Sequence, residues 1–442
     1  MKVCKFGGTS MANAECISKV RDIIVSDPEV AYVIVSAPGK REKNDTKVTD
    51  LLYRAYDHVS EGMTASEAFA PVRERFDAIL SELNLDVDFS SRYEEIENAL
   101  SEGTTKDYIA SRGEYLSAIV LSALTGWEFI DAKEFVRFDD KGNFLSEETN
   151  TYAGGVFHGV KKAIIPGFYG ASPDGKIKTF SRGGSDISGA IVARAVNARI
   201  YENWTDVDGF MKCDPRLVDN PEIMDIITYK ELRELSYMGA NVLHPDSIFP
   251  VRKKDIPINI RNTFNPSAKG TFIVPYKNFI TGEFKRKDST VTGIAGKRDF
   301  IVITVEKSMM NNELGFARRV LEVVERYGLG IEHMPSGIDT LSVILDGHVV
   351  NSELLAKVVD GIKAVCQPDI VTCDGNMALI AVVGHGMNKK KGTANKVCRA
   401  LYEADVNIRM IDQGSSEMNI IVGVENKDYE KAIVALYGEF MD

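Results

Sequence analysis

Short runs of apolar, often β-branched residues alternate with helical patterns through the first two-thirds of the chain. Three such runs, Val30–Val35, Lys162–Pro166 and Arg199–Trp204, each lead into a turn rich in glycine or aspartate. Strands that alternate with helices in this way predict a mainly parallel sheet with helices on its faces. The first two-thirds of the chain therefore read as an α/β domain.

Between about Met63 and Glu114 the strand-like runs disappear and a helical repeat takes their place. The apolar positions there recur at the spacing of one helix face. They are Phe69, Val72, Phe76, Ile79, Leu80 and Leu83. We interpret the segment as a helical insertion whose apolar stripe belongs to the core.

The pattern changes after Thr281, where a charged, turn-rich segment predicts a linker and places a boundary near residue 290. Beyond it, two segments share the order strand, Gly-containing turn, helix, two strands and closing helix. The expected elements are Phe300–Val305, Gly315–Tyr327, strands around Ile331–Leu345 and Ser352–Cys366, and then Met377–Val383, Thr393–Ala404, strands around Val406–Val422 and Tyr429–Tyr437. Two weakly similar βαββαβ units explain this order. The predicted domains are residues 1–288, 289–372 and 373–442.

Length and composition fit a soluble protein of two or three domains. The chain has 442 residues and a net charge of −11, which argues against broad binding to nucleic acids or anionic membranes. Its six cysteines form no CxxC pair, which is typical of reduced thiols in a cytosolic protein. No signal-peptide pattern opens the sequence, and no apolar stretch reaches the ~20 residues that span a bilayer. We expect a cytoplasmic protein with no membrane and no nucleic acid among its partners.

The strongest local signal is Lys5-Phe6-Gly7-Gly8-Thr9-Ser10, a strand that ends in glycines and hydroxyls before a helix-like segment. Glycine lets backbone N–H groups approach an anion, a helix start adds a positive dipole end, and Lys5 adds a mobile charge. The segment predicts a phosphate-binding loop, although an ordinary glycine turn at a strand end has the same pattern. It lacks the GxxxxGK[ST] pattern of a Walker A loop.

A second element, Phe180–Asp186, precedes a helix and repeats this logic with the guanidinium of Arg182. Arginine suits two-point capture of a carboxylate, and the Gly-Gly-Ser amides suit a second anionic group. Two anion sites in one domain are therefore predicted. For Asp186 the simpler role is a plain helix N-cap, which is compatible with catalysis.

Further polar segments follow predicted strands or begin predicted helices. Trp204–Gly209 and then Cys213–Arg216 come after a strand, where ligands of open α/β sheets bind. Ser36–Gly39 follows another strand, and Lys47–Asp50 and Ser111–Glu114 begin helices. Each is a common turn pattern by itself, and a solvated helix face is the simpler interpretation of the last one alone.

Together and in this order, these elements resemble the amino acid kinase superfamily and, within it, the aspartokinases. The resemblance rests on KFGGTS, VSA-x-G, SRGE, RGGSD, WTDVDG with DPR, and G-A-x-V-L-H-P at Gly239–Pro245. The C-terminal third resembles the paired ACT domains of that family, including Ile411–Ser415. The resemblance implies an α/β amino acid kinase fold, an αβα sandwich around a mainly parallel sheet, followed by two ferredoxin-like βαββαβ ACT domains. No homoserine dehydrogenase half follows in this sequence, so the implied form is monofunctional.

The implied activity moves the γ-phosphate of ATP to the side-chain carboxylate of L-aspartate, the first step toward lysine, threonine and methionine. By resemblance, Lys5 and Asp186 are catalytic. The implied aspartate-binding residues are Thr49, Glu114, Arg182 and Ser185. The implied nucleotide-binding residues are Lys5, Gly7, Gly8, Thr9, Ser36, Thr205, Asp206, Met211, Arg216 and Asn241. Mg²⁺ is expected to bind mainly through ATP and water, so no residue is assigned as its ligand.

Two positions depart from the pattern of relatives. Asn241 stands where many have lysine before Val-Leu-His-Pro, so a direct charge contact to ATP from this position is not implied. Met211 stands where some have tyrosine, which would alter packing or a hydrogen bond beside the adenine. Lys5, Arg182 and Asp186 are retained, so the expected activity stands.

The first ACT-like unit offers a site for an amino acid effector. The predicted residues are Asn311, Asn312, Gly315, Phe316, Glu332, Ser336 and Asp339. The first four lie at a turn into a helix whose N–H groups can receive an α-carboxylate, and the last three offer acceptors for an ε-ammonium. We expect inhibition by L-lysine, with L-threonine as the alternative effector. The other interpretation is that these residues only cap and solvate the unit and bind no ligand. By resemblance, the ACT domains assemble the chain into a homodimer or a dimer of dimers.

Two other functions fit parts of the sequence. A kinase of the same superfamily would act on glutamate, N-acetylglutamate, carbamate or UMP, but the ACT-like tail and the SRGE element favour aspartate. A catalytically silent amino-acid sensor would keep the fold as a scaffold, whereas the lysine and arginine of the two anion sites are intact. ADP release measured with and without L-aspartate separates these functions.

Overall fold

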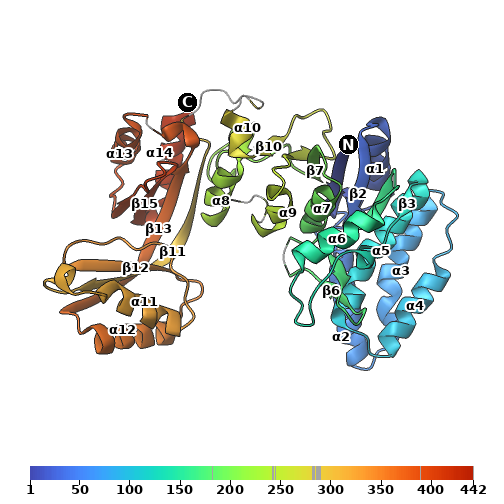
Figure 1. The fold of residues 1–442 in the computed structure, drawn as a ribbon, viewed down its shortest axis with the longest axis horizontal. Coiled ribbons are helices and arrows are strands. Elements are labelled where there is room, and N and C mark those ends of the chain that lie inside the picture. Colours follow the sequence, from blue (N-terminus) through green and yellow to red (C-terminus); the bar gives the residue numbers. More distant parts are fainter. Residues whose placement is uncertain are drawn as a thin grey trace. The chain divides into compact units, whose positions relative to one another are not determined.

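The structure, a computed structural model, describes residues 1–181, 183–240, 243, 245–280, 284, 290–388 and 390–441. It divides into two compact units, and each is described by itself (Figure 1). Unit 1 comprises Met1–Phe210, Ile223–Leu232 and Val242–Arg286, and unit 2 comprises Met211–Glu222, Arg233–Asn241 and Lys287–Asp442. The predicted linker and the predicted boundary at 288 fall in a segment that lies mostly outside the described residues. No helix among the described residues is long and apolar enough to cross a membrane.

A mainly parallel sheet forms the centre of unit 1, as the sequence predicted. Within the described residues it has eight strands, which in sheet order are β3 (Glu128–Phe129), β4 (Ala163–Pro166), β2 (Val30–Val35), β1 (Lys2–Phe6), β7 (Ile200–Thr205), β9 (Ile258–Asn262), β10 (Thr271–Val274) and β8 (Ile226–Thr228). Neighbouring strands are parallel except for β9 and β10. A small hairpin of β5 (Tyr169–Ala171) and β6 (Ile177–Thr179) stands apart from it. The three strands predicted from the apolar runs are confirmed as β2, β4 and β7.

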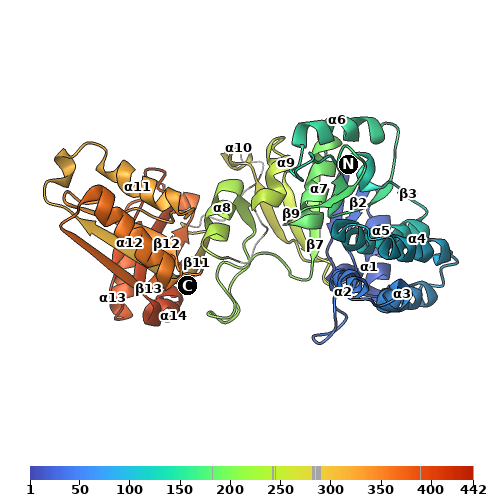
Figure 2. The same ribbon diagram turned by 90° about the horizontal axis from the view of Figure 1, so that it is seen from below.

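Helices cover both faces of this sheet (Figure 2). On one face lie α1 (Ala14–Ser26), α2 (Val48–Ser60), α3 (Ala65–Glu82), α4 (Ser90–Ser101) and α5 (Lys106–Thr125). On the other lie α6 (Ser146–Val156), α7 (Gly184–Ala195) and α9 (Phe249–Arg252). Unit 1 also contains η1 (Thr9–Met11), η2 (Ala132–Glu134), η3 (Pro245–Ile248), α10 (Tyr276–Ile280) and the first part of α8 (Tyr229–Tyr237), which continues into unit 2. This is the layered arrangement that an open α/β sheet needs to bury both faces.

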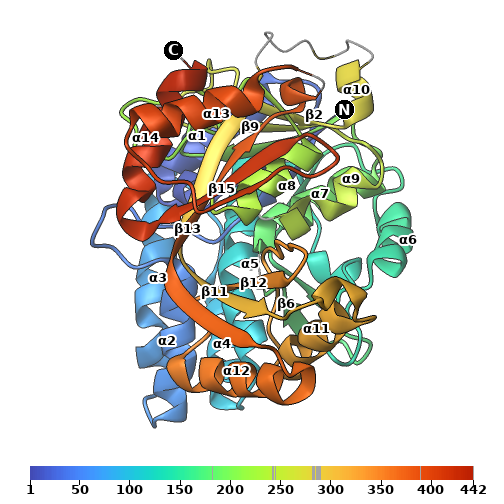
Figure 3. The same ribbon diagram turned by 90° about the vertical axis from the view of Figure 1, so that its left-hand side faces the viewer.

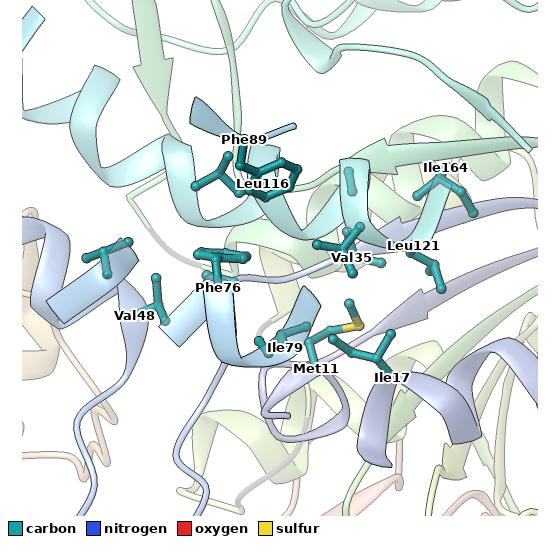
Figure 4. Packing of buried hydrophobic residues seen from close by; sticks show 14 of the residues in the cluster. Met11, Ile17, Val35, Val48, Phe76, Ile79, Phe89, Leu116, Leu121 and Ile164 are labelled. Atoms are coloured by element: carbon teal, nitrogen blue, oxygen red, sulfur yellow. The ribbon is translucent and has the colours of Figure 1, made fainter. Parts of the chain in front are cut away.

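The predicted helical insertion is confirmed as α3, α4 and the first part of α5. Phe69, Phe76 and Ile79 are buried in one cluster with side chains of α2, α4 and α5. Figure 4 shows Phe76 and Ile79 in this cluster. Burying one such side chain contributes about 1.5–3 kcal/mol. Capping explains where these helices begin, because the Thr64 hydroxyl accepts the N–H of Glu67 at α3 and Thr105 does the same at α5.

Unit 2 is built on an antiparallel sheet with two unusually long strands. Among the described residues its order is β12 (Thr340–Asp346), β11 (Gly293–Glu306), β13 (Ile370–Val383), β15 (Asn419–Glu425) and β14 (Met410–Asp412). The long strands β11 and β13 pair with each other over most of their length and run through both halves of the unit (Figure 3). The sequence predicted only their most apolar parts, because polar residues such as Arg298, Asp299 and Asp374 interrupt the pattern.

Each half of this sheet carries its own pair of helices and its own core. Helices α11 (Phe316–Arg326) and α12 (Ser352–Cys366) pack on the C-terminal part of β11 and on β12, around Ile303 and Val343. Helices α13 (Thr393–Glu403) and α14 (Tyr429–Met441) pack on the other half, around Ile380. The four helices begin and end close to the predicted positions. In contrast, the strand expected near Ile331 exists only as isolated bridges to β12.

The two halves share strands instead of following one another along the chain. Ile294, at the start of β11, pairs with Val382 and belongs to the core of the second half, whereas Ile303 belongs to the first. The first half is thus inserted between the first strand of the second half and the rest of it. The predicted division at 372/373 falls inside β13.

Candidate active site

The loops after β1, β2 and β7 meet at one edge of the sheet because the three strands are adjacent and parallel. The N–H of Gly7 donates to the carbonyl of Trp204 at 3.1 Å, and the N–H of Ser36 donates to the carbonyl of Phe6 at 3.1 Å. The chain crosses from β1 to neighbours on both sides, and ligands of open α/β sheets bind at such a point. The sequence-predicted phosphate loop therefore lies where this fold places ligands.

Two glycines from different loops are in direct backbone contact. The N–H of Gly39 donates to the carbonyl of Gly8 at 2.8 Å. A Cβ on Gly39 would lie 2.6 Å from the carbonyl carbon of Gly8, which is closer than real Cβ contacts allow. A Cβ on Gly8 would approach the carbonyl oxygen of Ala37 to 3.2 Å. Only glycine at position 39 permits this approach, and it leaves the backbone on this edge free of side chains.

Lys5 and Asp186, the two predicted catalytic residues, form an ion pair. Lys5 Nζ lies 2.7 Å from Asp186 Oδ1, and the Lys5 side chain is only 10% exposed. Asn203 Nδ2 donates to the same oxygen at 2.9 Å, and the Tyr201 hydroxyl donates to the Asp186 carbonyl at 3.0 Å. Asp186 lies in the first turn of α7, whose N-cap is Gly183, so the plain N-cap interpretation of Asp186 is wrong.

Glu114 is a buried carboxyl group with an unpaired oxygen. It lies on α5, is 5% exposed, and accepts a hydrogen bond from the backbone N–H of Ala37. Its Oε2 has no hydrogen-bond partner. Burial raises the pKa of Glu114 to about 8, although the backbone donors and the charges of Arg112 and Lys5 oppose the rise. The solvated helix face that the sequence alone favoured is therefore wrong for Glu114.

Arg112 is buried too, inside a ring of tyrosines. Its guanidinium lies 4.4 Å from the ring centre of Tyr108, 4.5 Å from that of Tyr115 and 5.5 Å from that of Tyr169. It also donates to the Ser111 hydroxyl at 2.8 Å. Cation–π contacts of this kind hold a positive charge in a partly apolar place. Arg112 thus fixes a positive charge on the helix that carries the Glu114 carboxyl.

Three polar side chains meet at the exposed rim between β1 and β7. The hydroxyls of Thr9 and Thr205 donate to the two carboxylate oxygens of Asp206 at 3.1 Å and 3.2 Å. The structure therefore brings together three residues that the sequence assigned to the nucleotide.

The other predicted residues stand as follows. Thr49 is partly buried in the first turn of α2, and Ser185 is buried in the first turn of α7. Arg182 and Asn241 lie outside the described residues. Met211 and Arg216 belong to unit 2, where Met211 is exposed and Arg216 pairs with Asp214 at 2.6 Å.

The predicted effector residues all lie in unit 2. Asn311 and Asn312 form part of η4 (Met310–Asn312), Gly315 is the N-cap of α11 with φ +75°, and Phe316 is buried. Glu332, Ser336 and Asp339 lie in the segment before β12. The Glu332 side chain accepts a hydrogen bond from Tyr237, and burial together with Glu332 raises the pKa of Tyr237 to about 12. Lys307 pairs with Glu313 at 2.7 Å and holds the turn before α11.

Asn203 and Tyr201 were missed by the sequence analysis. Both belong to β7, and both hold Asp186. A signal did exist for Asn203, since a polar residue inside a buried central strand needs a partner.

Comparisons with known proteins show to which family this chain belongs. The profile of the amino acid kinase family matches residues 1–262, and an ACT domain profile matches residues 380–440. Aspartokinase 3 of Bacillus subtilis (strain 168) is 38% identical over 457 residues, which covers 100% of this chain and 98% of that protein. The chain belongs to the aspartokinases of the amino acid kinase family. The expected family and the α/β and ACT fold are therefore confirmed.

Solved structures of the family extend the likeness to three dimensions. The aspartate kinase of Clostridium acetobutylicum is 48% identical with a TM-score of 0.92, and the match covers 100% of both chains. Escherichia coli aspartokinase III, 25% identical, matches over 100% of both chains in two forms. Its complex with aspartate and ADP (R-state) has a TM-score of 0.74, and its complex with lysine and aspartate (T-state) has a TM-score of 0.72.

Proposed function

We propose that this chain transfers the γ-phosphoryl group of ATP to the β-carboxylate of L-aspartate, giving ADP and 4-phospho-L-aspartate. One observation carries the proposal at the site. The Lys5–Asp186 ion pair and the unpaired buried carboxyl of Glu114 belong to the same ligand-binding edge of the sheet, joined through the loops at Gly8 and Ala37. The Lys5 ammonium of the pair can bind a phosphoryl group, and the unpaired carboxyl of Glu114 can bind an ammonium group.

The reaction needs electrostatic help more than proton transfer. A free aspartate side chain, with a pKa of about 3.9, is already ionised at neutral pH and needs no general base. Its attack brings one anion onto a polyanion, and the transition state spreads charge over the transferred oxygens. Cations and N–H donors that are fixed before the reaction lower this barrier.

Lys5 and the amides of Gly7 and Gly8 would meet the transferred phosphoryl group. Lys5 is held at the end of β1 by Asp186, which is itself held by Asn203. Because these contacts fix the ammonium before substrate binds, little reorganisation is needed in the transition state. Asp186 thus orients Lys5 and balances its charge.

The substrate aspartate would be held through both of its backbone groups. Glu114 would receive the α-ammonium at its unpaired Oε2, and Arg182 would clamp the α-carboxylate through two hydrogen bonds. Thr49 and Ser185, at the N-terminal turns of α2 and α7, would orient the molecule.

The nucleotide would bind at the rim of unit 1 formed by Thr9, Thr205 and Asp206, with Ser36 on the loop after the neighbouring strand β2. Family resemblance alone assigns Met211, Arg216 and Asn241 to nucleotide binding. Among the described residues no cluster of three or more His, Cys, Asp or Glu side chains could hold a metal ion. Mg²⁺ would arrive on the ATP phosphates with its own water, where it would lower their charge.

The ACT half would make the enzyme responsive to an amino acid end product. L-lysine is the proposed inhibitor and L-threonine the alternative, bound near Gly315 and the acceptors Glu332, Ser336 and Asp339. An inhibitor must bind a low-activity arrangement more tightly than an active one, and a coupling of about 5- to 150-fold is typical. Assembly into a homodimer or dimer of dimers through this half, and a cytoplasmic location, belong to the same proposal.

The test is ADP release by the full chain with ATP and Mg²⁺, with and without L-aspartate. We expect release that depends on aspartate and is absent with glutamate, N-acetylglutamate, carbamate or UMP. Release that prefers one of those acceptors would reassign the substrate. A chain that binds lysine by calorimetry but releases no ADP would be a sensor without kinase activity.

A further inference from the structure

Arg75 is a charged residue on the apolar face of α3. It lies between Val72 and Phe76, which are both fully buried, and its own side chain is only 4% exposed. A buried guanidinium is costly unless its donors are satisfied. The hydrogen-bond partners of Arg75 therefore indicate which parts of the chain it stabilises.

The Arg75 guanidinium contacts three separate points of the chain. Its Nη2 donates to the carbonyl of Gly39 at 2.6 Å and to the carbonyl of Ala12 at 3.2 Å. Its Nη1 lies 2.8 Å from Asp45 Oδ2. Asp45 is also held by Arg41, and these donors keep the pKa of its carboxyl well below the usual range.

These three points belong to the loops after β1 and β2, at the edge of the sheet where the phosphate loop lies. Ala12 ends the turn that begins at Gly8, and Gly39 is the residue whose backbone packs on Gly8. Asp45 lies further along the second loop, just before α2. Glycines have no side chains that could fix these two loops to each other. The guanidinium of Arg75 does so instead, because it binds both loops.

We propose that Arg75 is a positioning residue for phosphoryl transfer, which fixes the Gly8 loop and the Gly39 loop against each other. This inference rests on the proposed kinase function. Arg75 is buried and its guanidinium points to the two loops, so it would act through the backbone amides that meet the phosphoryl group. Lysine at this position keeps the charge, but its single ammonium cannot donate to all three acceptors as the planar guanidinium does.

The experiment compares Arg75→Lys and Asp45→Asn with a matched control, Arg194→Lys. Arg194 is also a buried arginine of unit 1, but it pairs with Glu147 at 2.6 Å and Ser146 at 2.9 Å, away from these loops. For each full-length variant we would measure kcat, the KM values for ATP and aspartate, Tm, and amide hydrogen exchange of residues 7–12 and 36–47.

We expect kcat of Arg75→Lys and Asp45→Asn to fall by about 10- to 100-fold, since a misplacement of about 1 Å costs on that order. Both KM values should stay within about threefold, and amide exchange should accelerate in the two loops. Arg194→Lys should keep its kcat, whatever its loss in Tm.

The proposal is overturned if Arg75→Lys keeps the wild-type kcat, or if its defect is a raised KM for aspartate alone. If Arg75→Lys does not fold, Asp45→Asn decides by the same criteria. Amide exchange reports on the tie between the loops without any activity. A wild-type chain that releases no ADP would therefore refute the proposed function, whereas unchanged exchange in the two loops would refute the role of Arg75.

Discussion

The buried carboxyl of Glu114 makes a pH dependence of aspartate binding the sharpest test of the substrate site. Its pKa is raised to about 8, chiefly by burial, so the group is mostly protonated at neutral pH before aspartate binds. An α-ammonium needs the ionised form as its partner. Aspartate binding should therefore release the proton of Glu114, and affinity should rise with pH.

The size of the effect follows from the raised pKa. With a pKa of about 8, roughly 1% of Glu114 is ionised at pH 6 and roughly half at pH 8. Affinity for aspartate should therefore increase about 50-fold over this range, or about 2.3 kcal/mol. About one proton should be released per bound aspartate at pH 6, and about half a proton at pH 8.

Stability should change in the opposite direction. The folded-state pKa lies above the ordinary value of 4.5, so the folded chain binds more protons than the unfolded chain between these values. The contribution of Glu114 to stability is complete below pH 4.5 and is lost as the pH rises through about 8. Between pH 6 and 8 the unfolding free energy of the wild type should fall by about 2.3 kcal/mol relative to Glu114→Gln.

Isothermal calorimetry in buffers of different ionisation enthalpy counts the released protons, and urea unfolding at each pH gives the stability. Glu114→Gln is the control, because the amide keeps the shape and has no proton to release. It should bind aspartate weakly at every pH, without the 50-fold rise. Wild-type binding that is independent of pH between 6 and 8 and releases no proton would refute the assignment of Glu114 to the α-ammonium.

Three further changes test other parts of the molecule. Lys5→Ala should lower kcat by about 100- to 1,000-fold in the ADP-release assay, because a fixed donor to the transferred group is lost; wild-type turnover would remove Lys5 from the reaction. Glu202→Gln should cost about 3 kcal/mol in urea unfolding with kcat per folded molecule unchanged, because Glu202 is a buried partner of Lys2 at 3.2 Å and of the Trp204 indole at 3.1 Å. Glu332→Ala should raise the lysine concentration for half-inhibition by about tenfold, because a charged hydrogen bond to the ε-ammonium is lost. An unchanged response would refute Glu332 as the ammonium ligand but not the regulation by lysine.

Local patterns predicted the fold where a segment's own residues decide its structure. The buried strand Val30–Val35, the stripe on α3 and the helix Ser352–Cys366 were all readable from spacing, because their apolar positions match the period of the element. The long strands β11 and β13 were not. Their polar parts, such as Arg298 and Asp374, have no apolar period. Asp374 is in a strand because β11 pairs with it, whereas Arg298 lies where the register of the pairing shifts.

The site shows the same difference between residues in local motifs and residues placed by tertiary contacts. Only the first kind could be predicted from the sequence. Lys5, Gly8 and Asp186 stand in motifs that are contiguous in sequence, so their chemistry is visible in a few letters. The residues that support them come from distant elements. Arg75 is 63 positions from Ala12 and 36 from Gly39, and only the fold shows that it holds both. Sequence does mark such a residue in one way, since a charge on the apolar face of a helix must have partners. A charged residue within a predicted apolar stripe of a helix therefore indicates a buried polar contact to another part of the chain.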